Sequence, residues 1–370
     1  MSVSYGGDKI TFDDGTSIAS GLSHFRNRII NGAMEIDQRN AGASMVPVDA
    51  YTLDRWEVRE DTDGAVTMQQ ISDAPTGFKN SARITITTAD SSLTGTQRLF
   101  LRQVIEGNNV ADLAWGTASA KTITLSFWVK SSVIGTFSGS LGNSGNARNY
   151  VFTYTINSAN TWEYKTVTIP GDTSGTWLTD TGAGVNVFFT LGSGPDYTTS
   201  SPNSWVSGFR ILASGSTSLI GTLNATWQVT GVQFEVGSYA TTFERRAYGT
   251  ELQLCQRYCQ SYTYTTGTII SVGTTFGSAV GVFVLPFIVP LRNAPSLITI
   301  PTLGSGAGQW AVLLKGGGYP STFGTIAAGT ASPYQMRLDF SGMTSMFVDG
   351  SQAVTLYASG NPVVTVSAEY

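Results

Sequence analysis

A two-residue alternation of apolar and polar side chains recurs along this 370-residue chain and restricts its fold more than any other feature. Such an alternation puts apolar side chains on one face of an extended segment, as a half-buried strand requires. The apolar positions are Ala82, Ile84 and Ile86; Leu99, Leu101 and Ile105; Ile123, Leu125, Phe127 and Val129; Tyr150, Phe152, Tyr154 and Ile156; Val167 and Ile169; and Val185, Val187, Phe189 and Leu191. Residues 26–248 contain no helix-period stretch of useful length. We therefore expect an all-β fold of two facing antiparallel sheets, a jelly roll or close relative, with residues 135–149 as a loop rich in Gly, Ser and Asn.

A short helix separates this region from a second β region. Val232, Phe234 and Val236 alternate as a strand that Gly237 ends, and Thr250 with Gln253 forms a capping box for a helix from Thr250 to about Gln260. The strands expected beyond it are 263–272, 278–289, 296–300, 310–314, 335–340, 353–358 and 363–368, which would make a small sandwich or barrel. Because the chain exceeds the size that one core usually serves, we expect three parts: 1–25, 26–248 and 249–370.

The first part contains a hairpin signal. Residues 9–18 predict two short strands about an Asp14-Gly15 turn. A lone hairpin is marginally stable. It therefore needs a surface to pack on, either trimer mates, a docking partner or the edge of the jelly roll.

Charged residues make up 12% of the chain, about half the usual share, so hydroxyl groups must solvate much of the surface. The net charge is −4 and no Lys/Arg cluster occurs, which disfavours nucleic acid as a partner. For the short run Glu244-Arg245-Arg246 we expect pairing with carboxylates. The chain opens without an apolar stretch, and its most apolar run, 279–291, is too short to cross a bilayer, so we expect synthesis in a cytoplasm and no membrane insertion.

Catalytic groups are scarce. His24 is the single imidazole, which excludes Ser-His-Asp and Cys-His catalysis. Cys255 and Cys259 are four residues apart on the expected helix, where we predict buried thiols with neither a disulfide nor a metal. Paired carboxylates for glycan cleavage could come from Asp172, Asp180, Asp196 or Glu163, but each lies among turn-forming residues, so we expect structural roles and no enzyme.

Three segments carry a resemblance to a known family. NRIINGAMEIDQRN, YTLDRW and VTGVQFEVGSYATTFERRAYGTELQLCQRYCQSY resemble bacteriophage and prophage virion proteins, namely tail or head fibres whose central unit is a carbohydrate-binding-like jelly roll. The resemblance is best over residues 26–262. KTITLSFWVKS and IPGDTSGTW are also typical of this family.

The resemblance implies a non-enzymatic virion protein, a short homotrimeric fibre that recognises host-surface polysaccharide. Its N-terminus would dock onto other virion proteins through Ile10, Phe12, Asp14 and Ile18. Three alternatives stay open: a capsid or tail decoration or adaptor that contacts only virion proteins, a glycan depolymerase, and a bacterial carbohydrate-binding module.

A sugar site needs aromatic faces for the apolar side of a pyranose. Trp128 points away from the face that carries Phe127 and Val129, which makes it the most informative aromatic residue. The other candidates flank polar or Gly-rich loops. The full set of ligand-binding candidates is Trp128, Trp162, Trp177, Tyr197, Trp205 and Tyr319. Burial in the core or in a subunit contact is the alternative for each.

The resemblance also suggests a calcium site. Asn31 to Glu35 matches the opening motif of carbohydrate-binding jelly rolls, where an acidic residue binds calcium. The last strand carries Gln233 and Glu235 in place of paired Asp residues. Glu35 and Glu235 are thus the metal candidates, although calcium prefers six to eight oxygens. We expect no other cofactor.

Overall fold

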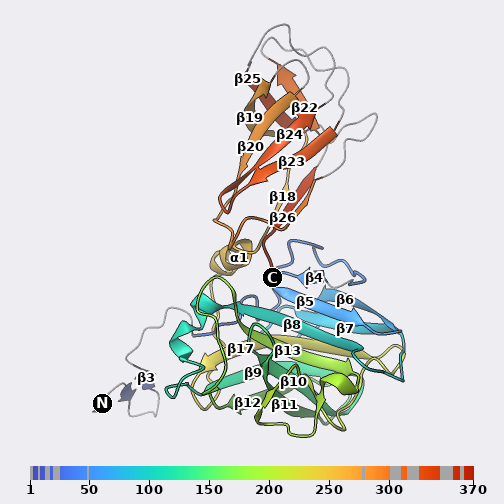
Figure 1. Ribbon diagram of the computed structural model, residues 1–370, viewed down its shortest axis with the longest axis vertical. Coiled ribbons are helices and arrows are strands. Elements are labelled where there is room, and N and C mark those ends of the chain that lie inside the picture. Colours follow the sequence, from blue (N-terminus) through green and yellow to red (C-terminus); the bar gives the residue numbers. More distant parts are fainter. Residues whose placement is uncertain are drawn as a thin grey trace.

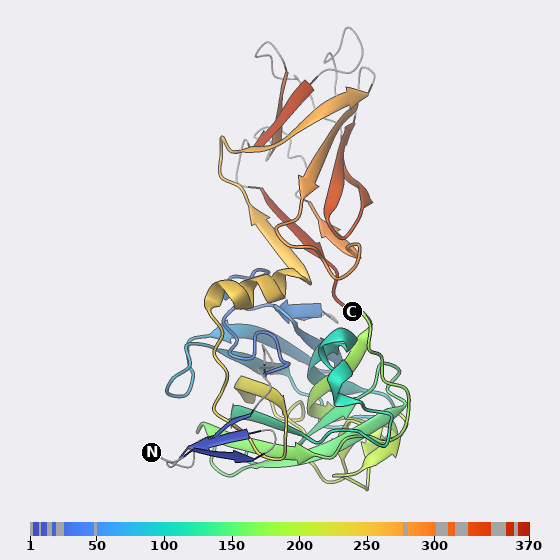
Figure 2. The ribbon, with the colours of Figure 1, turned by 90° about the vertical axis from the view of Figure 1, so that its left-hand side faces the viewer.

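The computed structural model describes residues 3–6, 9–12, 17–19, 26–47, 50–276, 280–300, 310–314, 325–341, 353–358 and 362–370. Two β-rich units are stacked along the long axis, with helix α1 (Tyr248–Gln256) between them (Figure 1, Figure 2). The expected fold class is confirmed: an antiparallel jelly-roll sandwich, a short helix, and a second, smaller β unit. No helix in the described part of the chain has the length and apolarity to cross a bilayer.

Two facing sheets build the jelly roll. The seven-stranded sheet has the order β15-β11-β10-β13-β8-β5-β4, and the five-stranded sheet has the order β12-β9-β17-β7-β6. The bounds are β4 Ala50–Leu53, β5 Trp56–Asp61, β6 Ala65–Ile71, β7 Ser81–Thr88, β8 Arg98–Glu106, β9 Ile123–Ser131, β10 Gly135–Gly142, β11 Arg148–Ile156, β12 Glu163–Ile169, β13 Ala183–Ser193, β15 Trp205–Ser207 and β17 Thr226–Val236. Short elements connect them: η1 Gly107–Asn109, η2 Ala111–Leu113, η3 Pro195–Tyr197, β14 Thr198–Thr199 and β16 Leu212–Ala213.

The main core lies between these sheets. Phe127 and Val129 of β9 are fully buried there, with Phe189 of β13 and Trp227 of β17. Trp227 donates from its indole nitrogen to the Tyr154 hydroxyl over 3.2 Å, which satisfies both polar groups inside the core. The apolar positions of the two-residue alternation are therefore the ones that lie on the inner, buried faces of the sheets.

The structure corrects one part of the sequence interpretation. Residues 135–142 form β10, where a loop was expected, and Phe137 and Leu141 of this strand are buried in the core. Gly139 is required there, because a Cβ would lie 2.3 Å from the ring of Phe152. Small residues thus serve close packing in this strand, although their composition is typical of a loop.

The second unit has a three-stranded sheet, β18-β26-β21, and a six-stranded sheet, β22-β25-β19-β20-β24-β23. Its core includes Phe283, Leu338 and Val366. The bounds are β18 Cys259–Thr263, β19 Ile269–Phe276, β20 Val280–Pro286, β21 Leu297–Thr299, β22 Trp310–Leu314, β23 Thr325–Ala331, β24 Gln335–Ser341, β25 Ala353–Ala358 and β26 Val363–Ser367. Of these strands, β23 was not anticipated, and β18 begins at Cys259, where the helix was expected to continue to about Gln260.

The N-terminal segment forms its own antiparallel sheet of β1 (Val3–Gly6), β2 (Lys9–Phe12) and β3 (Ser17–Ala19). Ile10 pairs with Ile18, so the two predicted strands are present, and β1 adds a third. Asp14 and the predicted turn lie outside the described residues, as does His24.

The capping prediction for the helix is wrong. Helix α1 begins at Tyr248 after Ala247, and no side chain caps it. It ends at Gln256, so Cys259 lies at the start of β18 and not on the helix. Both Cys255 and Cys259 are free and buried, and burial raises the pKa of each thiol.

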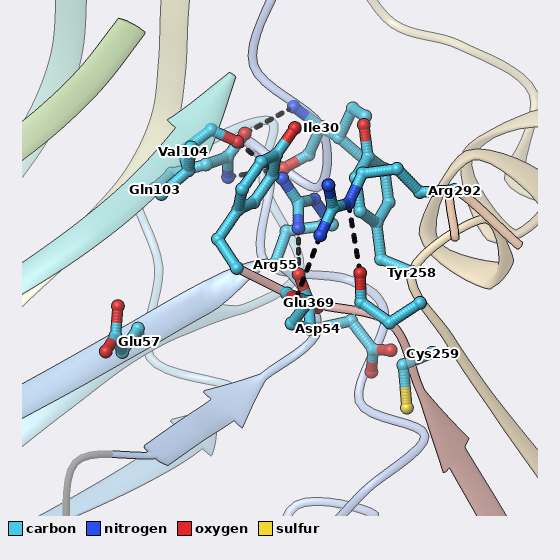
Figure 3. Close-up of polar contacts among 12 residues, drawn as sticks. Ile30, Asp54, Arg55, Glu57, Gln103, Val104, Tyr258, Cys259, Arg292 and Glu369 are labelled. Carbon is cyan, nitrogen blue, oxygen red and sulfur yellow. Dashed lines mark hydrogen bonds and ion pairs between the residues drawn. The ribbon is translucent and has the colours of Figure 1, made fainter. Parts of the chain in front are cut away.

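A buried ion pair joins the two units (Figure 3). The Arg55 guanidinium, 1% exposed, pairs with the Glu369 carboxylate, which follows β26. The ring of Tyr258 lies against the same guanidinium, with its centroid 3.4 Å from Cζ. Arg39 adds a second contact to Glu369 at 3.3 Å. Because these charges are withdrawn from water, each depends on the other for compensation.

Two further groups hold the same junction. Arg257, after α1, forms a two-pronged ion pair with Glu106 of β8 at 2.7 and 3.0 Å, and Tyr258 donates to Glu106 over 2.8 Å. From the second unit, Arg292 and Tyr370 donate to the Thr181 carbonyl of the jelly roll over 2.8 and 3.1 Å.

We predict that Glu369→Ala lowers the free energy of unfolding by about 3–5 kcal/mol, because it leaves the Arg55 guanidinium buried without its carboxylate. Urea unfolding measures this. The control is Asp339→Ala, which breaks an exposed pair with Arg337 and should change little. Replacing both partners, as Arg55→Met with Glu369→Leu, should recover much of the loss. A single variant as stable as the parent would contradict the role of this pair.

Stability should also depend on pH through Asp54, which accepts hydrogen bonds from the Gln38 backbone and side chain. Burial raises the pKa of Asp54 from 3.8 to about 6, although Arg39 and Gln38 oppose the rise. The folded state therefore binds a proton that the unfolded state has lost. Stability from this group is complete below pH 3.8 and is lost as the pH rises through about 6. Relative to Asp54→Asn, the melting temperature of the parent should fall over that window. A constant difference between the two proteins would contradict this.

Candidate functional site

The outward face of the five-stranded sheet carries a pair of aromatic rings. Trp128 of β9 pairs across strands with Tyr164 of β12, and their ring centroids are 5.3 Å apart. Trp128 is partly exposed, and Tyr164 is 44% exposed. The expectation that Trp128 points away from the core is correct, because its neighbours Phe127 and Val129 fill the inner face.

These two rings form part of a groove of about 420 Å³. The residues that line it come from the loop before β7, from β9, β12 and β17, and from the segment after β17: Phe78, Ser126, Trp128, Tyr164, Gly231, Ala240, Thr241, Thr242, Phe243 and Arg245. Phe78 and Phe243 meet edge to face at 5.1 Å. Four aromatic residues thus line one groove, and Trp128 is the only one of them among the ligand-binding residues predicted from the sequence.

A β-bulge in β17 makes the groove possible. The pairing of β17 with β9 shifts between Thr230 and Gln233, and Gly231 has a φ of +62°. A Cβ on Gly231 would lie 2.7 Å from the ring of Phe78 and 3.1 Å from Cδ1 of Trp128. Only glycine suits this position, for both its backbone conformation and its space.

Trp128 differs from the six other tryptophans whose side chains the structure describes, because its indole N–H has no acceptor in the described part of the protein. The indole nitrogens of Trp56, Trp115, Trp162, Trp177, Trp205 and Trp227 each donate to a protein oxygen. Among the described residues, that of Trp128 has no such acceptor, and the Tyr164 hydroxyl has no partner either. Both polar groups are available to a ligand, beside aromatic faces.

Trp162, which precedes β12, and Lys130 of β9 extend this face. Trp162 donates to Asp73 over 3.3 Å, and the Lys130 ammonium pairs with the same carboxylate while lying 5.3 Å from the Trp162 ring centroid. Burial raises the pKa of Asp73, but the hydrogen bonds from Lys130 and Trp162 outweigh it and hold the pKa below its usual value. Trp162, a predicted site residue, therefore lies close to the groove with its N–H already engaged.

Trp177 and Trp205 lie elsewhere, in a cluster with Trp115. The three rings pack edge to face with centroids 4.7–5.5 Å apart, against the main core. Both predicted residues donate to backbone carbonyls, of Ser174 and Pro170. This arrangement matches the alternative reading, core packing.

Tyr197 belongs to another small cluster. It packs on Phe209 at 4.8 Å, and the Arg98 guanidinium lies 5.0 Å from its ring centroid. The structure does not bring Tyr197 together with Trp128. Tyr319 lies outside the described residues.

The two metal candidates differ in their surroundings. The Glu235 carboxylate is buried and accepts from Gln233 and Thr241 over 2.6–2.9 Å, and Arg26 lies 3.3 Å away. Glu35 lines a separate hollow of about 100 Å³ beside Arg245 and Arg246. Within the described ranges, no three His, Cys, Asp or Glu side chains gather closely enough to hold a metal ion. The calcium site thus stays a prediction without a donor set around it.

Three of the four acids considered for glycan cleavage have structural contacts. Asp172 holds Arg148 through two bonds of 2.8 Å, and Asp180 accepts from the Gly182 amide. Burial opposes ionisation of Glu163, but hydrogen bonds from Lys165 and from the backbone of Ser158 together outweigh it and lower the pKa of Glu163 to about 2. Asp196 is exposed in η3. None of the four lines the groove.

Comparison with known proteins finds structural likeness only. No protein-family model and no curated protein matches the chain. A structure described as "CBM4 structure and function" is 19% identical, with 56% of this chain and 98% of that chain covered and a TM-score of 0.32. The enzymatically active domain of tailspike protein 4 from bacteriophage CBA120 is 11% identical, with 60% and 23% covered and a TM-score of 0.31.

A family 11 carbohydrate-binding module from Clostridium thermocellum, in complex with a mixed-linked tetrasaccharide, is 14% identical, with 55% and 100% covered and a TM-score of 0.27. Carbohydrate-binding modules recur among the neighbours. At identities and TM-scores this low, the likenesses carry no argument about what this chain binds.

Proposed function

We propose that this chain is a non-enzymatic structural protein of a phage or phage-like particle, a short fibre or spike that binds host-surface glycans through the Trp128 groove. The observation that carries the glycan part is Trp128 itself. Among the tryptophans whose side chains the structure describes, it is the one with an indole N–H free of protein acceptors, and it lies in an aromatic groove.

The chemistry of the groove suits a sugar ring. The apolar face of a pyranose can stack on Trp128 or Tyr164, while its hydroxyl groups bond with the indole N–H and the tyrosine hydroxyl. Ser126, Thr241 and Thr242 add polar groups to the same groove. An apolar groove with a few fixed polar groups is the usual form of a small-ligand site.

Three features support the virion role. The sequence segments around Asn31, Trp56 and Phe243 resemble phage fibres, and the N-terminal sheet of β1 to β3 offers a docking element. The second unit also exposes apolar residues: Ile269 is 67%, Val272 66% and Val284 41% exposed. Exposed apolar side chains close together are typical of a protein contact.

We predict that Trp128→Ala weakens binding to its target glycan by about tenfold or more, because a central aromatic contact typically contributes above 1 kcal/mol. A panel of purified bacterial envelope polysaccharides, read by biolayer interferometry, measures this. Tyr334→Ala is the matched control, since Tyr334 is 67% exposed on the second unit. If the parent binds no polysaccharide but captures virion proteins, the adaptor alternative replaces this proposal.

We further predict a homotrimer. Contact between the exposed apolar residues of three copies would remove them from water. Size-exclusion chromatography with light scattering should return about three times the chain mass of 39.3 kDa. A clean monomer at micromolar concentration would remove the trimer from the proposal and leave glycan binding in place.

A further inference from the structure

We infer that the groove is specific for an acidic glycan, and that Arg245 binds a carboxylate of the sugar. This inference rests on the proposed glycan-binding function and names its substrate class. It starts from the charge in the groove, because Arg245 is the only charged residue among the ten that line it. A groove for a neutral sugar has no need of an uncompensated cation.

The guanidinium of Arg245 has no carboxylate partner among the described residues. Its neighbours do: Arg26 pairs with Glu235 at 3.3 Å, and Arg246 pairs with Glu251 at 3.0 Å. From the sequence, both arginines of the run Glu244-Arg245-Arg246 are expected to pair with carboxylates. That holds for Arg246 and fails for Arg245, which is exposed.

Aromatic rings fix the orientation of this cation. Its Cζ lies 4.7 Å from the ring centroid of Phe78 and 5.7 Å from that of Phe243, and its Nη2 donates to the Gly77 carbonyl. A guanidinium held by two rings and one hydrogen bond loses little entropy on binding. Its remaining N–H groups can make two parallel bonds to a carboxylate, which gives geometric selectivity as well as attraction.

The acids near Arg245 lie on its other side. Glu35, Glu244 and Glu251 line the adjoining hollow of about 100 Å³, which Arg245 also borders. Glu244 and Glu251 are bound to Arg246 or to backbone amides. Glu35 is beyond ion-pair distance from Arg245. The side that faces Trp128 and Tyr164 therefore keeps a positive potential with no lining acid to cancel it.

Matched polymers test the inference. Polygalacturonate, alginate, hyaluronan and acidic bacterial polysaccharides are each compared with a carboxyl-reduced form, which keeps the rings and linkages and removes the charge. The parent should bind at least one native polymer about tenfold more tightly than its reduced form, with salt weakening only the native interaction. Arg245→Gln should abolish that difference and leave binding to the reduced polymer within about twofold.

Two variants make the result specific. Arg337→Gln removes an exposed arginine of the second unit and should leave the preference intact. Arg245→Lys keeps the charge without the planar fork and should retain only part of the preference.

Each outcome is decisive. If the parent binds native and reduced polymers equally, and Trp128→Ala abolishes both, the acidic specificity is overturned while glycan binding stands. If Arg245→Gln loses both polymers alike, the arginine only supports the groove wall, and the inference is overturned. If no polymer or envelope polysaccharide binds the parent, the glycan-binding function itself fails.

Discussion

Burial of the two inner sheet faces is the constraint on which the rest of the structure depends. Once Phe127 and Val129 are committed to the core, the two-residue period of β9 directs Trp128 outward. The register of β12 then brings Tyr164 opposite Trp128, and just before β12 the ring of Trp162 lies 5.3 Å from the Lys130 ammonium. A one-residue slip would bury Trp128 and expose Phe127, so core and groove are two results of one register.

The features that could be predicted from the sequence are those that follow from its repeating two-residue pattern. Alternation in β7, β8, β9, β11 and β13 is regular, and from it the all-β class and the outward direction of Trp128 follow. It failed for β10, where small residues that permit close approach have the composition of a loop. The helix start was also misjudged, because Thr250 and Gln253 match a capping box while the chain enters the helix earlier, at Tyr248.

The groove could be predicted only in part. Phe78, Tyr164 and Phe243 are far apart in sequence, and each is unremarkable in its own segment. They come together because of the bulge at Gly231 and because the segment after β17 folds back over the sheet. Neither feature produces a repeating pattern in the sequence. Trp177 and Trp205 show the converse: their sequence surroundings resemble those of a sugar platform, yet both pack with Trp115. Whether an aromatic ring faces solvent is decided by tertiary packing, which local sequence does not report.

The connection between the units has a mechanical consequence. The backbone passes once from the jelly roll to the second unit, through residues 237–257, while β26 brings the chain end back to the boundary, where Glu369 meets Arg55 (Figure 3). A force that pulls the second unit away from the jelly roll would act first on the Arg55–Glu369 contact. The covalent connection through residues 237–257 would bear tension only after this contact opens. Short polar contacts of this kind tolerate little stretching and can form again when the load falls. The contact between the two units can therefore open under force and form again. While it is open, the second unit remains attached to the jelly roll through the backbone of residues 237–257.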